Sequence, residues 1–415
     1  MASTKTKNII IKNFSYLSLI QFITLISPFI YYPYLIRIYG PDKYGFIIYC
    51  QSIVLFLSVF VDFGINLYGP KVISENREDV NKLSEIVSSL FMIKIIMMFL
   101  MFIFYVAIIL IIPELRTKKE ISLLLFFVIL NDVFYAIWFF QGIEKNKYSA
   151  LINLLSRAFL LVFIFLGVNT RLGFYAFPLG LVLASIINSI LSVYFIFFVF
   201  KVKFRLVKFN LILIHFKQAY LLFISRFVGL IIIRLNGFLI GTLWGVQYVA
   251  YYDLAEKIVN LLSMPLNILN QVIYPRVAIS KNYSIVFSII KYTTSSYFLI
   301  YGLLLIFGKD LVIAFAGNDM LFSYKIILIL AITLIINSMS YFLGNCILVV
   351  SGNVSYFNKS IYYSTAIYIL LLLLFYLLDI LNPLSLSFLI VINCLSIVVI
   401  RVFYILKLKR QILSV

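Results

Sequence analysis

Long apolar runs separated by short polar segments follow one another along the whole chain. A helix needs about 20 mainly apolar residues to cross the hydrocarbon core of a bilayer. The chain has twelve runs of roughly that length, over residues 12–36, 43–68, 83–112, 119–140, 148–168, 174–200, 214–242, 246–275, 283–308, 322–350, 357–379 and 384–406. This pattern predicts an all-α polytopic membrane protein with twelve transmembrane helices, because the backbone polar groups of a helix bond within the segment.

One predicted helix, residues 246–275, carries polar side chains at helical spacing. Steps of one, three and four residues put them on one face: Asp253, Glu256, Lys257, Asn260, Ser263, Asn267, Asn270, Gln271 and Tyr274. An ionisable group in the membrane costs roughly 2.5–3.5 kcal/mol on insertion scales, so it usually faces a bundle interior or a wet cavity. The face therefore predicts a cavity-lining helix. The alternative is that its amide side chains only hydrogen-bond neighbouring helices.

The same stretch has a partner 205 residues earlier in the chain: Gly245 aligns with Gly40, and Pro275 with Pro70. The offset is close to half of the 415 residues, and internal repeats with a polar site at their interface are typical of transporters. We therefore predict two six-helix lobes related by an internal repeat, with a central cavity. The lobes are residues 1–200 and 214–415, with a basic cytoplasmic linker at 201–213. The side chains expected to line the cavity are Gln51, Asn66, Asn260, Asn267 and Gln271.

Composition agrees with a membrane protein, since 64% of the residues are hydrophobic, 12% are charged and the mean hydropathy is +1.11. The net charge of +19 is spread over short loops, so we expect no nucleic-acid partner. The N-terminal segment and the loops on its side hold 19 Lys and Arg, against 8 on the opposite side. Cytoplasmic loops carry the excess of positive charge, so both termini are predicted to be cytoplasmic. The most basic loop, Lys201–Lys217, suits an anionic membrane surface.

The other seven basic residues fall inside predicted spans: Lys94, Arg157, Arg226, Arg234, Lys257, Lys291 and Arg401. Lys291 and Arg401 lie near span ends, from where their side chains can extend to the headgroups. The other five are the predicted substrate-binding residues. Arg226 and Arg234 are the strongest candidates, because a helix puts residues eight apart within about 80° of each other. An electropositive interior suits a phosphate or pyrophosphate headgroup.

Four acidic residues inside the spans form the predicted ion-coupling or charge cluster: Asp62, Asp132, Asp253 and Glu256. Four prolines inside the spans are expected to interrupt or bend them: Pro28, Pro33, Pro178 and Pro265. The three cysteines have no metal-ligand spacing. We therefore expect no metal, no cofactor and no catalytic residue.

Several short motifs resemble those of one transporter family. They are Pro33-Tyr34-Leu35-Ile36-Arg37 with Gly40-Pro41 and Tyr44-Gly45, then Phe60–Leu67, Trp138–Lys145 and Tyr274-Pro275-Arg276. On these motifs the chain resembles Wzx-type O-antigen flippases, in the polysaccharide transporter branch of the multidrug/oligosaccharidyl-lipid/polysaccharide flippase superfamily. The resemblance implies a bacterial inner-membrane protein that is not an enzyme and is coupled to an ion. It also implies export of undecaprenyl-pyrophosphate-linked oligosaccharide repeat units to the periplasmic leaflet, with membrane lipids and other O-antigen assembly proteins as partners.

Two other functions stay open at this point. A drug/cation antiporter of the same superfamily is expected to have an acidic cavity. The spans of this chain hold four acidic residues and a larger number of basic residues, which disfavours the antiporter. A polytopic glycan polymerase needs a catalytic acid or base, usually on a sizeable loop outside the membrane. The predicted loops are short, which disfavours the polymerase.

Overall fold

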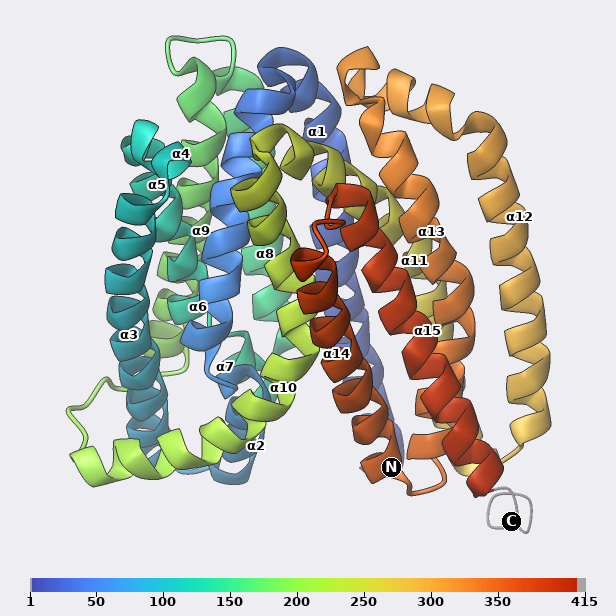
Figure 1. The fold of residues 1–415 in the computed structure, drawn as a ribbon. Coiled ribbons are helices and arrows are strands. Elements are labelled where there is room, and N and C mark those ends of the chain that lie inside the picture. Colours follow the sequence, from blue (N-terminus) through green and yellow to red (C-terminus); the bar gives the residue numbers. More distant parts are fainter. Residues whose placement is uncertain (1, 409–415) are drawn as a thin grey trace. The chain divides into compact units, whose positions relative to one another are not determined.

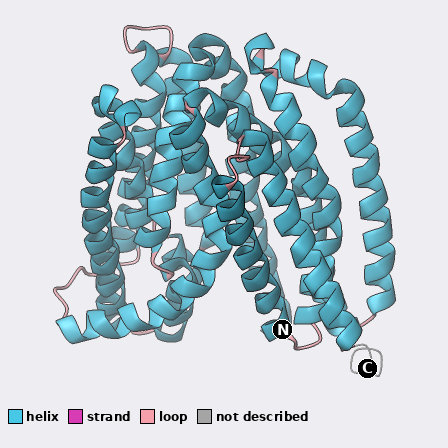
Figure 2. Ribbon diagram, viewed as in Figure 1, coloured by secondary structure: helices cyan, strands magenta, loops and turns pink. Residues whose placement is uncertain are grey.

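The computed structural model describes residues 2–408, except for the side chains of residues 2–14, 17, 18, 21, 25, 225, 226, 228, 230, 231, 233 and 234. Within that part, Figure 2 shows helices joined by short loops and no strand. The helices of the first half of the chain are α1 (Ala2–Asp62), α2 (Ile65–Asn76), α3 (Val80–Ile111), α4 (Pro113–Thr117), α5 (Lys119–Phe126), η1 (Phe127–Ile129), α6 (Leu130–Phe134), α7 (Ile137–Gly142), α8 (Asn146–Gly167), η2 (Gly173–Tyr175), α9 (Ala176–Tyr194) and η3 (Phe195–Val199). Those of the second half are α10 (Phe209–Trp244), α11 (Val246–Ser280), α12 (Tyr283–Ala316), η4 (Asn318–Met320), α13 (Phe322–Tyr341), η5 (Phe342–Val349), α14 (Val354–Leu377) and α15 (Pro383–Lys407).

The helices account for all twelve predicted spans. By length and composition, nine helical segments of the described residues can cross a membrane, and the first of them, Phe22–Asn76, bends at Gly40 and so holds two predicted spans. Helices α10 and α11, which are not among the nine, supply the other two predicted spans and make twelve. The chain is therefore a multi-pass helical membrane protein.

The chain divides into two compact units. The N-terminal unit holds the chain up to Tyr39 and Ile47–Phe238, and within it α9 packs on α5, α6 and α8 (Figure 1). The C-terminal unit holds Gly40–Phe46 and the chain from Leu239, and within it α13 packs on α11, α12 and α15. Helix α10 thus lies mostly in the first unit, although the basic linker before it was the predicted lobe boundary. That boundary stays a prediction.

The backbone repeats its geometry at the two aligned glycines. Gly40 has φ 67° and ψ 173°, and Gly245 has φ 96° and ψ 166°. A side chain is strained at such angles, so glycine is the residue that can join the two helices there. Pro70 and Pro275 both lie inside helices, α2 and α11. The repeat read from the sequence is therefore also present in the backbone.

Two predicted spans are broken at places the sequence did not indicate. In the second predicted span, helix α1 ends at Asp62, and the chain continues as α2 after Phe63 and Gly64, whose φ angles are 46° and 74°. The fourth span changes to a 3₁₀ turn at η1 and stops at Tyr135 and Ala136, before α7. The breaks contain no proline, whereas α11 continues through Pro265. Pro265 therefore does not interrupt its span, and a bend there stays a prediction.

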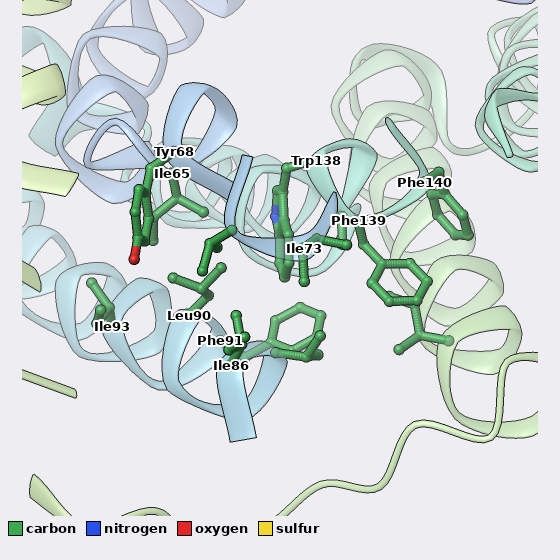
Figure 3. Packing of buried hydrophobic residues seen from close by; sticks show 14 of the residues in the cluster. Ile65, Tyr68, Ile73, Ile86, Leu90, Phe91, Ile93, Trp138, Phe139 and Phe140 are labelled. Atoms are coloured by element: carbon green, nitrogen blue, oxygen red, sulfur yellow. The ribbon is translucent and has the colours of Figure 1, made fainter. Parts of the chain in front are cut away.

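Aromatic and branched side chains pack the helices around both breaks into one core (Figure 3). Trp138 and Phe139 of α7 are fully buried with Ile73 of α2 and Leu90 of α3. The approach of α2 to α7 needs glycine, since a Cβ on Gly69 would lie 3.0 Å from the Trp138 side chain. Dense packing of this kind holds the short segments on either side of a break in fixed positions.

Candidate functional site: an inner cavity and buried charges

A single lysine joins the two broken spans. Lys94 of α3 has no exposed surface, and its ammonium lies 3.4 Å from the Asp62 carboxylate at the end of α1. The same ammonium donates to the backbone carbonyl of Asp132, at 2.9 Å, next to the break in the fourth span. Asp62 in turn accepts from the backbone N–H of Asn66, at 3.3 Å, in the first turn of α2. The two members of this ion pair therefore serve backbone groups at both breaks: Lys94 binds the Asp132 carbonyl, and Asp62 binds the Asn66 N–H.

Helix α9 supplies the other partners of the break in the fourth span. The Ser192 hydroxyl accepts from the backbone N–H of Ala136, at 3.0 Å. The Ser189 hydroxyl donates to the carbonyl of Leu130, at 3.1 Å. The Asn188 amide donates to the side-chain oxygen of Asn131, at 2.8 Å. An interrupted helix is tolerated inside a membrane protein when neighbouring side chains satisfy its backbone in this way.

A cavity of about 350 Å³ lies beside this break, inside the N-terminal unit. Helices α1, α6, α8 and α9 contribute its lining, whose polar residues are Gln51, Asn131, Asp132, Asn153, Ser156, Arg157, Ser185 and Asn188. Three residues predicted for different roles, Gln51, Asp132 and Arg157, thus line one cavity. Tyr31, Tyr32 and Tyr135 add aromatic surface.

The second charge cluster belongs to the C-terminal unit. Asp253 and Lys257 form an ion pair one helical turn apart on α11. The Tyr44 hydroxyl donates to the Asp253 carboxylate at 2.6 Å and lies 3.3 Å from the Lys257 ammonium. Tyr44 is fully buried, whereas the Asp253 and Lys257 side chains keep 13% and 19% of their surface exposed. The charge of Lys257 is therefore balanced within the protein, and its predicted contact with substrate stays a prediction.

The C-terminal unit buries a second basic residue, Arg401 of α15. Its guanidinium donates to the Ser340 carbonyl at 2.6 Å and to the Ser360 hydroxyl at 3.1 Å, and stacks 4.6 Å above the Phe357 ring centre. Only 5% of Arg401 is exposed, so the prediction that it extends to the headgroups is wrong. The Ser340 carbonyl stands where α13 changes to the π-helical turn η5, which explains why a donor from another helix is needed there.

The structure separates the remaining predicted residues. Asn260 and Gln271 are exposed and Asn267 is half-buried on α11, so their place in a central cavity stays a prediction, as does the role of Glu256. Lys94 is sealed from solvent and does not line the inner cavity. The side chains of Arg226 and Arg234 on α10 lie outside the described residues, and their predicted role is untested.

Sequence reasoning missed two groups of residues. Tyr44 was noticed only within a family motif, and nothing in its own surroundings points to a partner 209 residues away on α11. The amides Asn131, Asn153 and Asn188 were missed because they lie in three different apolar spans, and no sequence pattern links them. A count of amides inside spans gives a weak signal for them, but only the fold brings them together.

Comparison with known proteins places the chain in a family. Residues 10–282 match the family described as polysaccharide biosynthesis protein. The chain belongs to this family. A protein of Escherichia coli (strain K12) is 29% identical over 160 residues, and the match spans only 39% of either chain. A protein of Shigella dysenteriae is 25% identical over 282 residues, 66% of this chain and 68% of the relative.

Both relatives carry the name "Putative O-antigen transporter". These names agree with the prediction that the chain is a membrane transporter and not an enzyme. Among solved structures, the inward-facing form of a multidrug resistance MATE family transporter of the MOP superfamily has a TM-score of 0.70. The likeness covers 97% of this chain and 98% of that one, at 12% identity. It therefore concerns the fold, and it confirms the predicted fold class.

Proposed function

We propose that this chain is a flippase that carries a lipid-linked saccharide of the O-antigen type across the bacterial inner membrane. The substrate class is an undecaprenyl-pyrophosphate-linked repeat unit, and the direction is from the cytoplasmic to the periplasmic leaflet. The observation that carries the proposal is the similarity to the O-antigen transporter of Shigella dysenteriae over 282 residues. A fold shared with a known transporter supports it.

The internal structure of the N-terminal unit suits alternating access. Helices interrupted at Phe63 and Gly64, and again at Tyr135 and Ala136, give the N-terminal unit short segments that meet at fixed joints. Discontinuous helices that expose backbone groups near a polar cavity are a recurring feature of transporters. In this proposal the cavity side of the break at Tyr135 senses the substrate, and the packed core of Figure 3 transmits the change.

The buried charges divide into two proposed roles. Arg226 and Arg234 bind the pyrophosphate, because guanidinium groups grip phosphate oxygens in pairs. Asp253, Glu256 and Lys257 form a charge cluster whose protonation or ion occupancy couples transport to a gradient. The ion pair between Asp253 and Lys257, whose side chains keep 13% and 19% of their surface exposed, supports the second role.

The proposed orientation has both termini in the cytoplasm, on the 19 to 8 excess of Lys and Arg. Reporter fusions after Lys208 and Lys407 should then read cytoplasmic, and fusions after Lys118 and Trp244 periplasmic.

Complementation tests the function directly. A strain that lacks its O-antigen flippase but makes the matching repeat unit should recover surface O-antigen when it expresses this chain. Lipid-linked repeat units should stop accumulating on the cytoplasmic side. A drug/cation antiporter would instead raise drug resistance without restoring O-antigen, and a polymerase would lengthen glycans in a purified assay without any membrane gradient. Either result would replace the proposal.

A further inference from the structure

We propose that the inner cavity of the N-terminal unit is a binding subsite for one neutral sugar ring. The inference rests on the proposed function in one respect, namely that the sugar belongs to the transported lipid-linked saccharide. It adds a place for the saccharide that is distinct from the charges assigned to the pyrophosphate. The cavity volume of about 350 Å³ is at the small end of the range of ligand pockets, roughly 300–1,000 Å³.

The cavity wall contains hydrogen-bond acceptors that the protein leaves unused. The side-chain oxygens of Asn153 and Asn188 are buried and have no hydrogen-bond partner among the described residues. Asn153 and Asn188 are 6% and 8% exposed, and both line the cavity. Buried polar atoms are nearly always satisfied, so two orphan acceptors on residues that line one cavity indicate a missing donor.

The same wall also offers donors. Arg157 is half-buried at the cavity, and no described residue makes a hydrogen bond or ion pair with its guanidinium. The Gln51 side chain adds an amide that can donate and accept. Residues that carry orphan acceptors and an unused guanidinium therefore line one small space.

This mixture selects a class of ligand. A bare cation would suit the amide oxygens but would be repelled by Arg157, and an anion would suit Arg157 but not the amide oxygens or Asp132. A sugar hydroxyl both donates and accepts, so a ring with several hydroxyls satisfies both kinds of partner at once. Tyr31 and Tyr135 supply flat apolar surface for the carbon face of such a ring.

The experiment measures protection of a cysteine in the cavity wall. Cys50, Cys346 and Cys394 are replaced by alanine, and Leu55→Cys or Val128→Cys is introduced as the reporter; both positions line the cavity and keep exposed surface. The purified full-length protein in nanodiscs reacts with a small water-soluble thiol reagent. Separate arms contain glucose, galactose, N-acetylglucosamine or rhamnose, and sodium chloride, potassium chloride or phosphate.

At least one sugar should slow labelling at both reporter positions, by about tenfold at roughly ten times its dissociation constant. Asn188→Ala and Asn153→Ala should each remove most of this protection. The matched control is Asn393→Ala on α15, which also has a buried orphan oxygen but lies in the C-terminal unit. It should leave protection unchanged.

Other outcomes overturn the subsite. Protection by sodium and not by sugars would make the cavity a cation site, and protection by phosphate would make it an anion site. If no arm slows the labelling, the cavity holds only water. If neither reporter is labelled, the cavity is closed to the reagent. Complementation by the wild-type chain is measured in parallel. Sugar protection without complementation would refute the flippase alone, and complementation without protection would refute the subsite alone.

Discussion

The Lys94 ammonium lies 3.4 Å from the Asp62 carboxylate, and no part of Lys94 is exposed. The pair stands between two interrupted spans, because the same ammonium also donates to the Asp132 carbonyl. A buried ion pair adds little net stability, but removing one partner leaves an uncompensated charge in the interior. Lys94 is therefore a residue whose first role is to hold the shape of the N-terminal unit.

Replacing Lys94 with Met should destabilise the protein by about 3–5 kcal/mol, since Asp62 then keeps a buried charge without its cation. Thermal unfolding in detergent and the amount of protein in the membrane measure the effect. Lys291→Met, at an exposed position of α12, is the matched control and should be nearly neutral. Adding Asp62→Asn to Lys94→Met should recover part of the loss. If the double variant were less stable than the single one, the ion pair would not be the cause.

The close contact between the two repeated segments gives a second prediction. A Cβ on Gly45 would lie 2.0 Å from the Val246 carbonyl oxygen and 3.3 Å from the Ala250 Cβ, and Gly45 and Ala250 are themselves 205 residues apart. Gly45→Ala should therefore cost about 1–3 kcal/mol through overpacking. Thermal unfolding is the measurement.

The control for Gly45 is Gly302→Ala, because a Cβ there meets nothing within 4 Å and the residue lies inside α12. Alanine is the better helix former by about 1 kcal/mol, so this variant should be neutral or slightly stabilised. Equal losses for both variants would contradict the close approach of these segments.

Arg401 gives a third prediction. Arg401→Met removes the donors to the Ser340 carbonyl and the Ser360 hydroxyl, and should cost about 3 kcal/mol, the upper value for a hydrogen bond to a charged group. Arg401→Lys should recover only a part, because lysine lacks the planar fork. Unfolding temperatures compare both with Lys359→Met, an exposed change on α14. A fully stable Arg401→Met would mean that the π-helical turn needs no partner.

The proposed pyrophosphate site gives a fourth prediction. Arg226→Gln with Arg234→Gln should abolish complementation, while Lys at both positions should retain a part of it through charge alone. Membrane abundance must be measured together with O-antigen display, since loss of a structural arginine lowers the amount of protein. Normal display with Gln at both positions would remove these residues from the substrate site.

The sequence by itself determined the class of fold and the internal repeat. Both follow from features that act locally: the length of an apolar run decides whether a helix can cross a membrane, and a helix junction at positive φ restricts Gly40 and Gly245 to glycine. The polar face of α11 was also readable, because its period is that of a helix.

Only the tertiary structure decided where the helices break and which polar residues share a site. Asp62, Lys94 and Asp132 come from three separate helices, and their meeting is fixed by packing that no local pattern records. The breaks at Gly64 and Ala136 depend on partners elsewhere: the backbone of α10 lies against Gly64, and Ser192 accepts from Ala136. In the membrane a freed backbone group is tolerated only where the rest of the fold supplies its partner, so the break is a property of the whole unit rather than of the segment.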